Sequence, residues 1–182
     1  EEASHEPTLN LKHFVGRDDE TRRMVRVLEQ SLEVGPRVVC VIGEAGIGKS
    51  TLVRRLAGEV RARSGCLVAG QASEADAKPP FAPWAEALDA LDQFAVVPPR
   101  EWRELGRLVP ALARPGTEPT GNKYALLEEI AAYIRSAASL HPVVLLLDDM
   151  QWADAGTWDA LEHVLSQLTH EQIVLCVTVR TE

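Results

Sequence analysis

Hydrophobic residues in this chain fall into four short runs, separated by longer stretches in which they recur at helical spacing. The runs are rich in β-branched residues, as buried parallel strands are, and they cover residues 38–42, 66–70, 143–147 and 173–179. Between them, apolar residues return every three or four positions, which predicts helices over 18–32, 51–63, 81–94, 122–139 and 154–169. Strands that alternate with helices predict a three-layer α/β/α domain with a parallel sheet.

The same spacing predicts which side chains face the core. It turns Tyr124 and Trp158 inward, and Asp18 is well placed to be the N-cap of the first helix. Pro98-Pro99 is predicted to open a short helix that carries Trp102, Leu105 and Leu108. The segment 110–121 holds three prolines and two glycines, and we expect it to be mobile.

One glycine-rich stretch stands between the first strand and the helix that follows it. It fits the pattern G-x-x-x-x-G-K-[ST] and reads Gly43-Glu44-Ala45-Gly46-Ile47-Gly48-Lys49-Ser50. In such a P-loop, glycines let backbone N–H groups turn toward a phosphate, and the start of the helix adds a partial positive charge. Lys49 would reach the β- and γ-phosphates, Ser50 would bind Mg²⁺, and Thr51 would lie near the α-phosphate.

Two acids, Asp148 and Asp149, follow the apolar run 143–147. They lie where ligands bind in open α/β sheets, outside the carboxyl ends of the strands. A hydrophobic strand that ends in an acid is the Walker B pattern, so Asp148 is predicted to hold the Mg²⁺. Asp149 would orient or deprotonate the attacking water. Arg180, at the end of the last strand, would sense the γ-phosphate, or it is a solvated arginine at a strand end.

Composition narrows the setting. The net charge of -8 gives no reason to expect nucleic acid on this segment. The three cysteines, Cys40, Cys66 and Cys176, form no C-x-x-C pair and lie in strand-like runs, so we expect buried reduced thiols and a cytoplasmic protein. No apolar run approaches the length of a membrane span.

Taken together, the motifs resemble the STAND branch of the P-loop ATPases, which is related to the AAA+ and origin-recognition ATPases. The resemblance rests on the P-loop sequence and on residues 145–154, which contain the Walker B motif and the loop after it. It also rests on the sensor-like strand end Val177-Thr178-Val179-Arg180 and on Phe14-Val15-Gly16-Arg17. It is greatest to the ATPase domains of large bacterial regulators, including LuxR-type and maltose-regulator-like activators.

This resemblance implies a five-stranded core in the order 5-1-4-3-2, followed by a helical lid and a winged helix. With four strands, residues 14–182 would be an ATPase domain truncated before strand five and the lid, preceded by a leader at 1–13. The strand before the P-loop would then form an exposed edge. Val15 and Arg17 would lie near the adenine, although Arg17 could also be a helix-start arginine paired with nearby acids. Any DNA contact would use regions outside this chain.

In function, the resemblance implies a switch with ATP, ADP and Mg²⁺ as cofactors. ADP would hold a closed monomer, and ATP would permit self-assembly, with hydrolysis as a reset. Asp149 is one methylene shorter than the glutamate found in most AAA+ hydrolases, which predicts slow hydrolysis. Two alternatives remain: a small-molecule phosphotransferase with 110–121 as its lid, and a hydrolysis-dead scaffold stabilised by nucleotide. The absence of an N-K-x-D pattern at Asn122-Lys123 argues against a GTPase.

Overall fold

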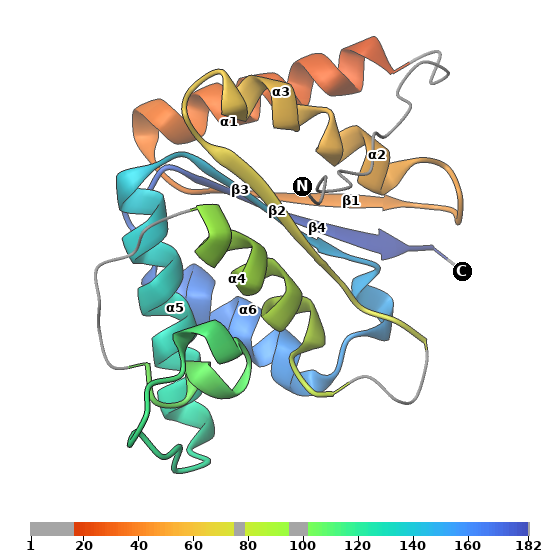
Figure 1. Cartoon of the computed structure of the whole chain (residues 1–182). Helices are drawn as coiled ribbons and strands as arrows, with labels where there is room; N and C mark the ends of the chain where they lie inside the picture. Colours follow the sequence, from red (N-terminus) through yellow and green to blue (C-terminus); the bar gives the residue numbers. More distant parts are fainter. Residues whose placement is uncertain (1–16, 75–78, 95–101, 182) are drawn as a thin grey trace, which may run out of the picture.

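The computed structural model describes residues 17–74, 79–94 and 102–181, which form a parallel sheet between two helix layers (Figure 1). Hydrogen bonds order its strands β1-β4-β3-β2, and their bounds are β1 Arg37–Gly43, β2 Cys66–Gln71, β3 Val143–Asp148 and β4 Ile173–Arg180. The predicted α/β fold class is therefore confirmed, with β1 at one edge of the sheet. The predicted leader at 1–13 and Val15 lie outside the described residues.

The described helices lie in two layers, one on each side of the sheet (Figure 1). One layer consists of α1 (Asp18–Val34), α2 (Lys49–Arg54) and α3 (Leu56–Arg61). The other consists of α4 (Ala82–Phe94), α5 (Lys123–Leu140) and α6 (Ala155–Gln167). The helix predicted over 51–63 is thus divided at Arg55, but its apolar face is buried as expected. No described helix is long and apolar enough to cross a membrane.

The central strand β3 is buried along its whole length because helices cover both of its faces. Val144 and Leu146 belong to the core beneath α1, α2 and α3. Val143, Leu145 and Leu147 belong to the larger core beneath α4, α5 and α6. The acids at the end of β3 are therefore held by a strand that is anchored on both sides.

By contrast, the edge strand β1 is covered on one face only. Its residues alternate between half-buried and exposed, and Val38 and Ile42 are 54% and 62% exposed. Cys40 lies between them and is exposed, so the prediction that all three cysteines are buried is wrong for Cys40. Both β1 and β3 contain a continuous run of apolar residues. Such a run does not show whether helices cover one face of the strand or both.

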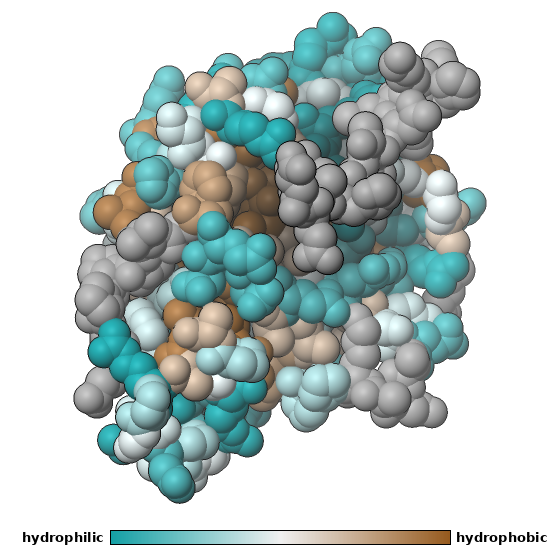
Figure 2. Space-filling view, viewed as in Figure 1, coloured by the Kyte–Doolittle hydropathy of each residue, from teal (hydrophilic) through white to brown (hydrophobic). Residues whose placement is uncertain are grey.

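The second edge strand, β2, is exposed to a smaller extent. On the face seen in Figure 2, most of the surface is hydrophilic, and hydrophobic surface gathers between the two helix layers, over β2. Leu67 and Ala69 are half-buried and pack against the core beneath α1, α2 and α3. The hydrophobic surface over β2 is therefore compatible with a strand whose residues also pack into the core.

Three other predictions fail at helix starts. Asp18 is the first residue of α1 rather than its cap, a position taken by the backbone of Arg17. Tyr124 is 65% exposed and Trp158 is 40% exposed. Both lie in the first turn of their helices. The helical period places them on the apolar face of the helix, but less of the protein packs against that face at the end of a helix. The Tyr124 ring instead meets the His163 ring of α6 edge-on, with 5.7 Å between the ring centroids.

In the described part of the connection between α4 and α5, from residue 102 on, lie the short 3₁₀ turns η2 (Leu105–Arg107) and η3 (Pro110–Leu112). The predicted start of the short helix, Pro98-Pro99, lies outside the described residues, and within 102–109 the helical part is η2. Glu104 is 1% exposed and accepts bonds from Thr120 N, Thr120 Oγ1 and Gly121 N. Burial opposes ionisation of Glu104, but these bonds and Arg107 outweigh it and lower its pKa. The mobility of 110–121 stays a prediction.

Candidate functional site

The P-loop joins the end of β1 to the start of α2. Gly46 and Gly48 have φ angles of 72° and 88°, in the left-handed region that residues with a Cβ seldom adopt. Gly48 is also the N-cap of α2, so the chain curls immediately before the helix begins. The two glycines therefore permit the tight loop that the motif predicts.

Lys49 is almost completely buried, with 6% of its surface exposed. Its Nζ donates hydrogen bonds to the carbonyl oxygens of Gly43, at 2.9 Å, and Glu44, at 3.0 Å. A buried ammonium group needs such partners because it has lost its contact with water. The two loop carbonyls thus hold the Lys49 side chain along the inside of the P-loop.

Asp148 is the last residue of β3 and is 3% exposed. Ser50 Oγ donates to Asp148 Oδ1 at 2.7 Å, although the two residues are 98 positions apart in the chain. Parallel strands bring their carboxyl ends to one edge of the sheet, and the P-loop starts from that same edge. The fold therefore joins the two predicted metal ligands directly.

Asp149 points elsewhere because its backbone is left-handed, with φ 54°. Its Oδ2 accepts a hydrogen bond from Gln71 Nε2 at 3.0 Å, and its Oδ1 accepts one from Gln151 Nε2 at 3.3 Å. Gln151 Oε1 in turn accepts from the backbone N–H of Arg180 at 3.0 Å. The second acid is thus linked to the ends of both β2 and β4.

A pocket of about 390 Å³ lies over the P-loop. Five residues with predicted side-chain roles line it, namely Lys49, Ser50, Thr51, Asp149 and Arg180. The remaining lining residues belong to the P-loop and are Ala45, Gly46 and Gly48. Ile47, in the same loop, is 43% exposed and is not among these lining residues. Arg17 caps α1 and does not line this pocket.

This arrangement agrees with a comparison against protein families. The family model described as AAA ATPase domain matches residues 13–177, which include the P-loop and both acids. The chain belongs to this family. Membership in an ATPase family supports nucleotide binding and hydrolysis. A comparison with curated proteins found no match to the chain.

Within this AAA ATPase domain, three polar residues were missed by sequence reasoning: Gln71, Gln151 and Thr178. Thr178 is completely buried in β4, where it interrupts an otherwise apolar run. Its hydroxyl donates to Asp148 Oδ1 at 2.5 Å and accepts from Asp149 N at 2.9 Å. A polar residue inside a buried strand signals a hydrogen-bond partner, and this signal was present in the sequence.

Among the described residues, no group of three or more His, Cys, Asp or Glu side chains could hold a metal ion. Ser50 and Asp148 instead offer two hard oxygen donors in contact with each other. Mg²⁺ is commonly bound by one or two such protein groups together with phosphate oxygens. The donor set therefore fits Mg²⁺ bound with a nucleotide.

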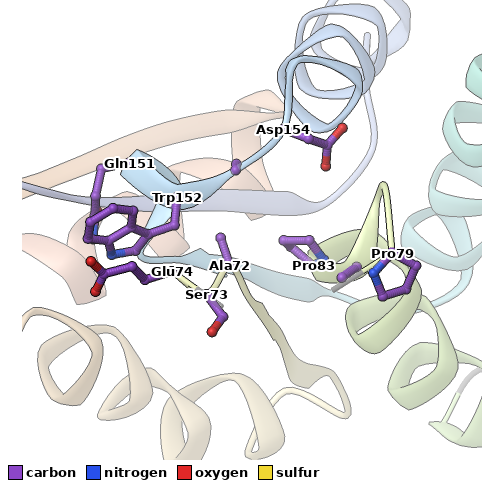
Figure 3. Close-up of a pocket in the computed structure, with 10 residues that line it drawn as sticks. Ala72, Ser73, Glu74, Pro79, Pro83, Gln151, Trp152 and Asp154 are labelled. Carbon is purple, nitrogen blue, oxygen red and sulfur yellow. The ribbon is translucent and has the colours of Figure 1, made fainter. Parts of the chain in front are cut away.

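A second pocket, of about 460 Å³, lies between the end of β2, the start of α4 and the segment after Asp149 (Figure 3). Trp152 is 40% exposed and lies beside Glu74 at one end of it (Figure 3). At the other end, the carboxylate of Asp154 accepts bonds from Phe81 N and from the N–H and hydroxyl of Thr157. Burial opposes ionisation of Asp154, but these bonds lower its pKa. Asp154 is thus committed to capping α6.

Proposed function

We propose that this AAA ATPase domain is an ATP/ADP-binding switch of a bacterial signalling or transcriptional regulator, with slow Mg²⁺-dependent ATP hydrolysis. The observation that carries the proposal is the 2.7 Å contact between Ser50 of the P-loop and Asp148 of β3. A hydroxyl and a carboxylate that already touch need little movement to share one small cation. Preorganised ligands of this kind favour binding because little ordering is left to be done.

The phosphates would lie in the P-loop pocket. Lys49 would face the β- and γ-phosphates in exchange for its bonds to the loop carbonyls, and Thr51 would lie near the α-phosphate. Ser50 and Asp148 would hold Mg²⁺, which when bound neutralises charge on the phosphate oxygens. Because Lys49 and Ser50 are the first two residues of α2, the start of one helix would position both the lysine charge and one metal ligand, and β3 would supply the other ligand, Asp148.

Asp149 would orient the attacking water and accept its proton, and Arg180 would contact the γ-phosphate. Both residues line the same pocket as Lys49. Slow hydrolysis is supported by the partners of Asp149, because both of its carboxylate oxygens already accept bonds from glutamine amides. To orient a water, this side chain would have to give up or share one of those contacts.

Val15 and Arg17 remain our candidates for contacts to the adenine. We also propose that a further strand packs beside β1, and the exposure of Val38 and Ile42 on that edge supports this. Self-association in the ATP state and DNA binding would depend on regions outside this chain.

A cytoplasmic location is supported by two free, buried cysteines. Burial raises the pKa of Cys66 to about 11 and that of Cys176 to about 12. Thiols in this state stay protonated and resist oxidation, as expected for structural cysteines in a reducing compartment.

Nucleotide binding is tested by Lys49→Ala, with ATP affinity measured by titration calorimetry. We expect a loss of about 100-fold or more, because the variant removes the buried charge that faces the phosphates. Lys123→Ala is the matched control, since Lys123 is half-exposed on α5 and pairs with Asp159. Equal affinity in wild type and Lys49→Ala would overturn the site assignment.

The switch is tested separately, by sedimentation of the protein saturated with ADP or with ATP. A switch should change size or shape between the two nucleotides. Identical sedimentation of both forms, also in any longer protein that includes this domain, would leave nucleotide binding intact and refute the regulatory role.

A further inference from the structure

Thr178 lies on β4, next to Asp148 at the end of the neighbouring strand β3. It is the sixth residue of β4, two positions before Arg180, and none of its surface is exposed. Its Oγ1 lies 2.5 Å from Asp148 Oδ1 and 2.9 Å from the backbone nitrogen of Asp149. One hydroxyl group therefore contacts both members of the acid pair.

The direction of these two bonds follows from their chemistry. A backbone N–H can only donate, so the Thr178 oxygen accepts from Asp149. Its single proton is then available to Asp148, whose carboxylate oxygen accepts it. The result is a chain of bonds from Asp149 N–H through the hydroxyl to Asp148, and bonds in such a chain strengthen one another.

Asp148 Oδ1 also accepts the bond from Ser50 Oγ at 2.7 Å. Two hydroxyls, one from β4 and one from the P-loop, thus converge on a single carboxylate oxygen. The other oxygen, Oδ2, takes part in neither bond. Thr178 is the donor that would remain on Asp148 if Ser50 turned toward a metal, because its side chain is completely buried and its proton already points to Asp148 Oδ1.

We propose that Thr178 is a positioning residue for Mg²⁺-dependent nucleotide binding. Its hydroxyl holds the Asp148 carboxylate toward Ser50 and holds Asp149 in its left-handed backbone conformation, so that the two acids point in different directions. This inference rests on the proposed nucleotide function. It differs from the role predicted for Arg180, because Thr178 acts through the acids, whereas Arg180 is among the residues that line the 390 Å³ pocket over the P-loop and Thr178 is not.

The test compares the ATP affinity of the full chain in EDTA with its affinity in saturating Mg²⁺, by titration calorimetry. The ratio of the two is the Mg²⁺ enhancement, and it does not depend on hydrolysis. Thr178→Val keeps the shape of the side chain and removes the hydroxyl. It should reduce the enhancement by about tenfold or more, as expected for one lost bond to a charged group, with little change in EDTA.

Two variants serve as controls. Thr178→Ser restores the hydroxyl and should return the enhancement to within about threefold of wild type. Thr157→Val removes another fully buried threonine hydroxyl, the one that donates to Asp154 on α6. It should lower thermal stability and leave the enhancement unchanged, which separates positioning from general packing.

A double-mutant cycle locates the effect. In an Asp148→Asn background, Thr178→Val should change the enhancement much less than in wild type, because the partner carboxylate is already gone. If Thr178→Val does not fold, Thr178→Cys keeps the volume with a weaker donor and should show a partial loss.

The outcomes separate this inference from the proposed function. A wild-type protein that binds no ATP overturns both. Wild-type binding with a full Mg²⁺ enhancement in Thr178→Val, or in Thr178→Cys where valine does not fold, overturns the positioning role and leaves the function standing. An equal loss of affinity with and without Mg²⁺, or no rescue by serine, also overturns it.

Discussion

At Gly70 of β2, the backbone of α4 lies very close to the sheet. A Cβ added there would lie 1.7 Å from the carbonyl oxygen of Pro83 and 2.6 Å from its carbonyl carbon. Both atoms belong to the backbone of the first turn of α4, so no side chain can rotate away. Gly70→Ala therefore requires β2 and α4 to separate by about 1.5 Å or more to reach an ordinary contact distance.

The energetic effect follows from what α4 holds in place. Trp84, Leu88 and Leu91 are completely buried, and Trp84 Nε1 donates to the carbonyl of Thr157 at 3.0 Å. Overpacking costs about 1–3 kcal/mol, and a weakened buried hydrogen bond adds about 1–2 kcal/mol. For a domain of this size, a total of about 2–5 kcal/mol lowers the melting temperature by about 4–20 °C.

Thermal unfolding followed by circular dichroism measures this directly. Gly58→Ala is the matched control, because a Cβ at Gly58 in α3 meets nothing within 4 Å. It should raise stability by about 0.5–1 kcal/mol through helix propensity. A Gly70→Ala protein that melts at or above the wild-type temperature would show that α4 does not lie against β2 in this way. Gln71 follows Gly70, so ATP turnover should change in the same variant.

Three further predictions concern individual side chains. Asp149→Asn should lower ATP turnover by about 100-fold, measured as phosphate release, because it removes the candidate base; affinity should change less than about threefold, and unchanged turnover would identify another base. The lowered pKa of Glu104, relative to its ordinary value of 4.5, means that its contribution is complete above about pH 5 and is lost as the pH falls through the folded value. Glu104→Gln should therefore be about 2 kcal/mol less stable at pH 7, and urea unfolding should show a smaller difference at pH 3. Cys40 should react with a thiol reagent in the native protein while Cys66 and Cys176 react only after unfolding; three equal rates would contradict the exposure of β1.

The elements that the sequence predicts well are those whose signal is local. β3 is a continuous apolar run, and α1 and α4 show a clear helical period, so their positions followed from the residues alone. The order of the strands did not, and came from the resemblance to known ATPases. Tyr124 and Trp158 show the limit of periodicity. The helical period shows which face of a helix is apolar, but it does not show whether another element covers that face along its whole length.

The candidate site divides in the same way. Lys49, Ser50 and Asp148 were found because each belongs to a short motif with a fixed spacing. Gln71 and Gln151 were not, because their contacts with Asp149 depend on how three chain segments end at one sheet edge. Such contacts become visible only when the order and register of the strands are known.

Thr178 lies between these two cases. The register pairs Leu147 of β3 with Val177 of β4, so that the next residues, Asp148 and Thr178, stand level with each other. A buried hydroxyl must find a partner, and the nearest group at that level is a carboxylate. The one polar residue that interrupts the apolar run of β4 was therefore interpretable in principle, once β4 was known to lie beside β3. The polar side chain of Thr178 in an apolar strand indicates that it has a hydrogen-bond partner, and the order and register of the strands identify that partner as Asp148.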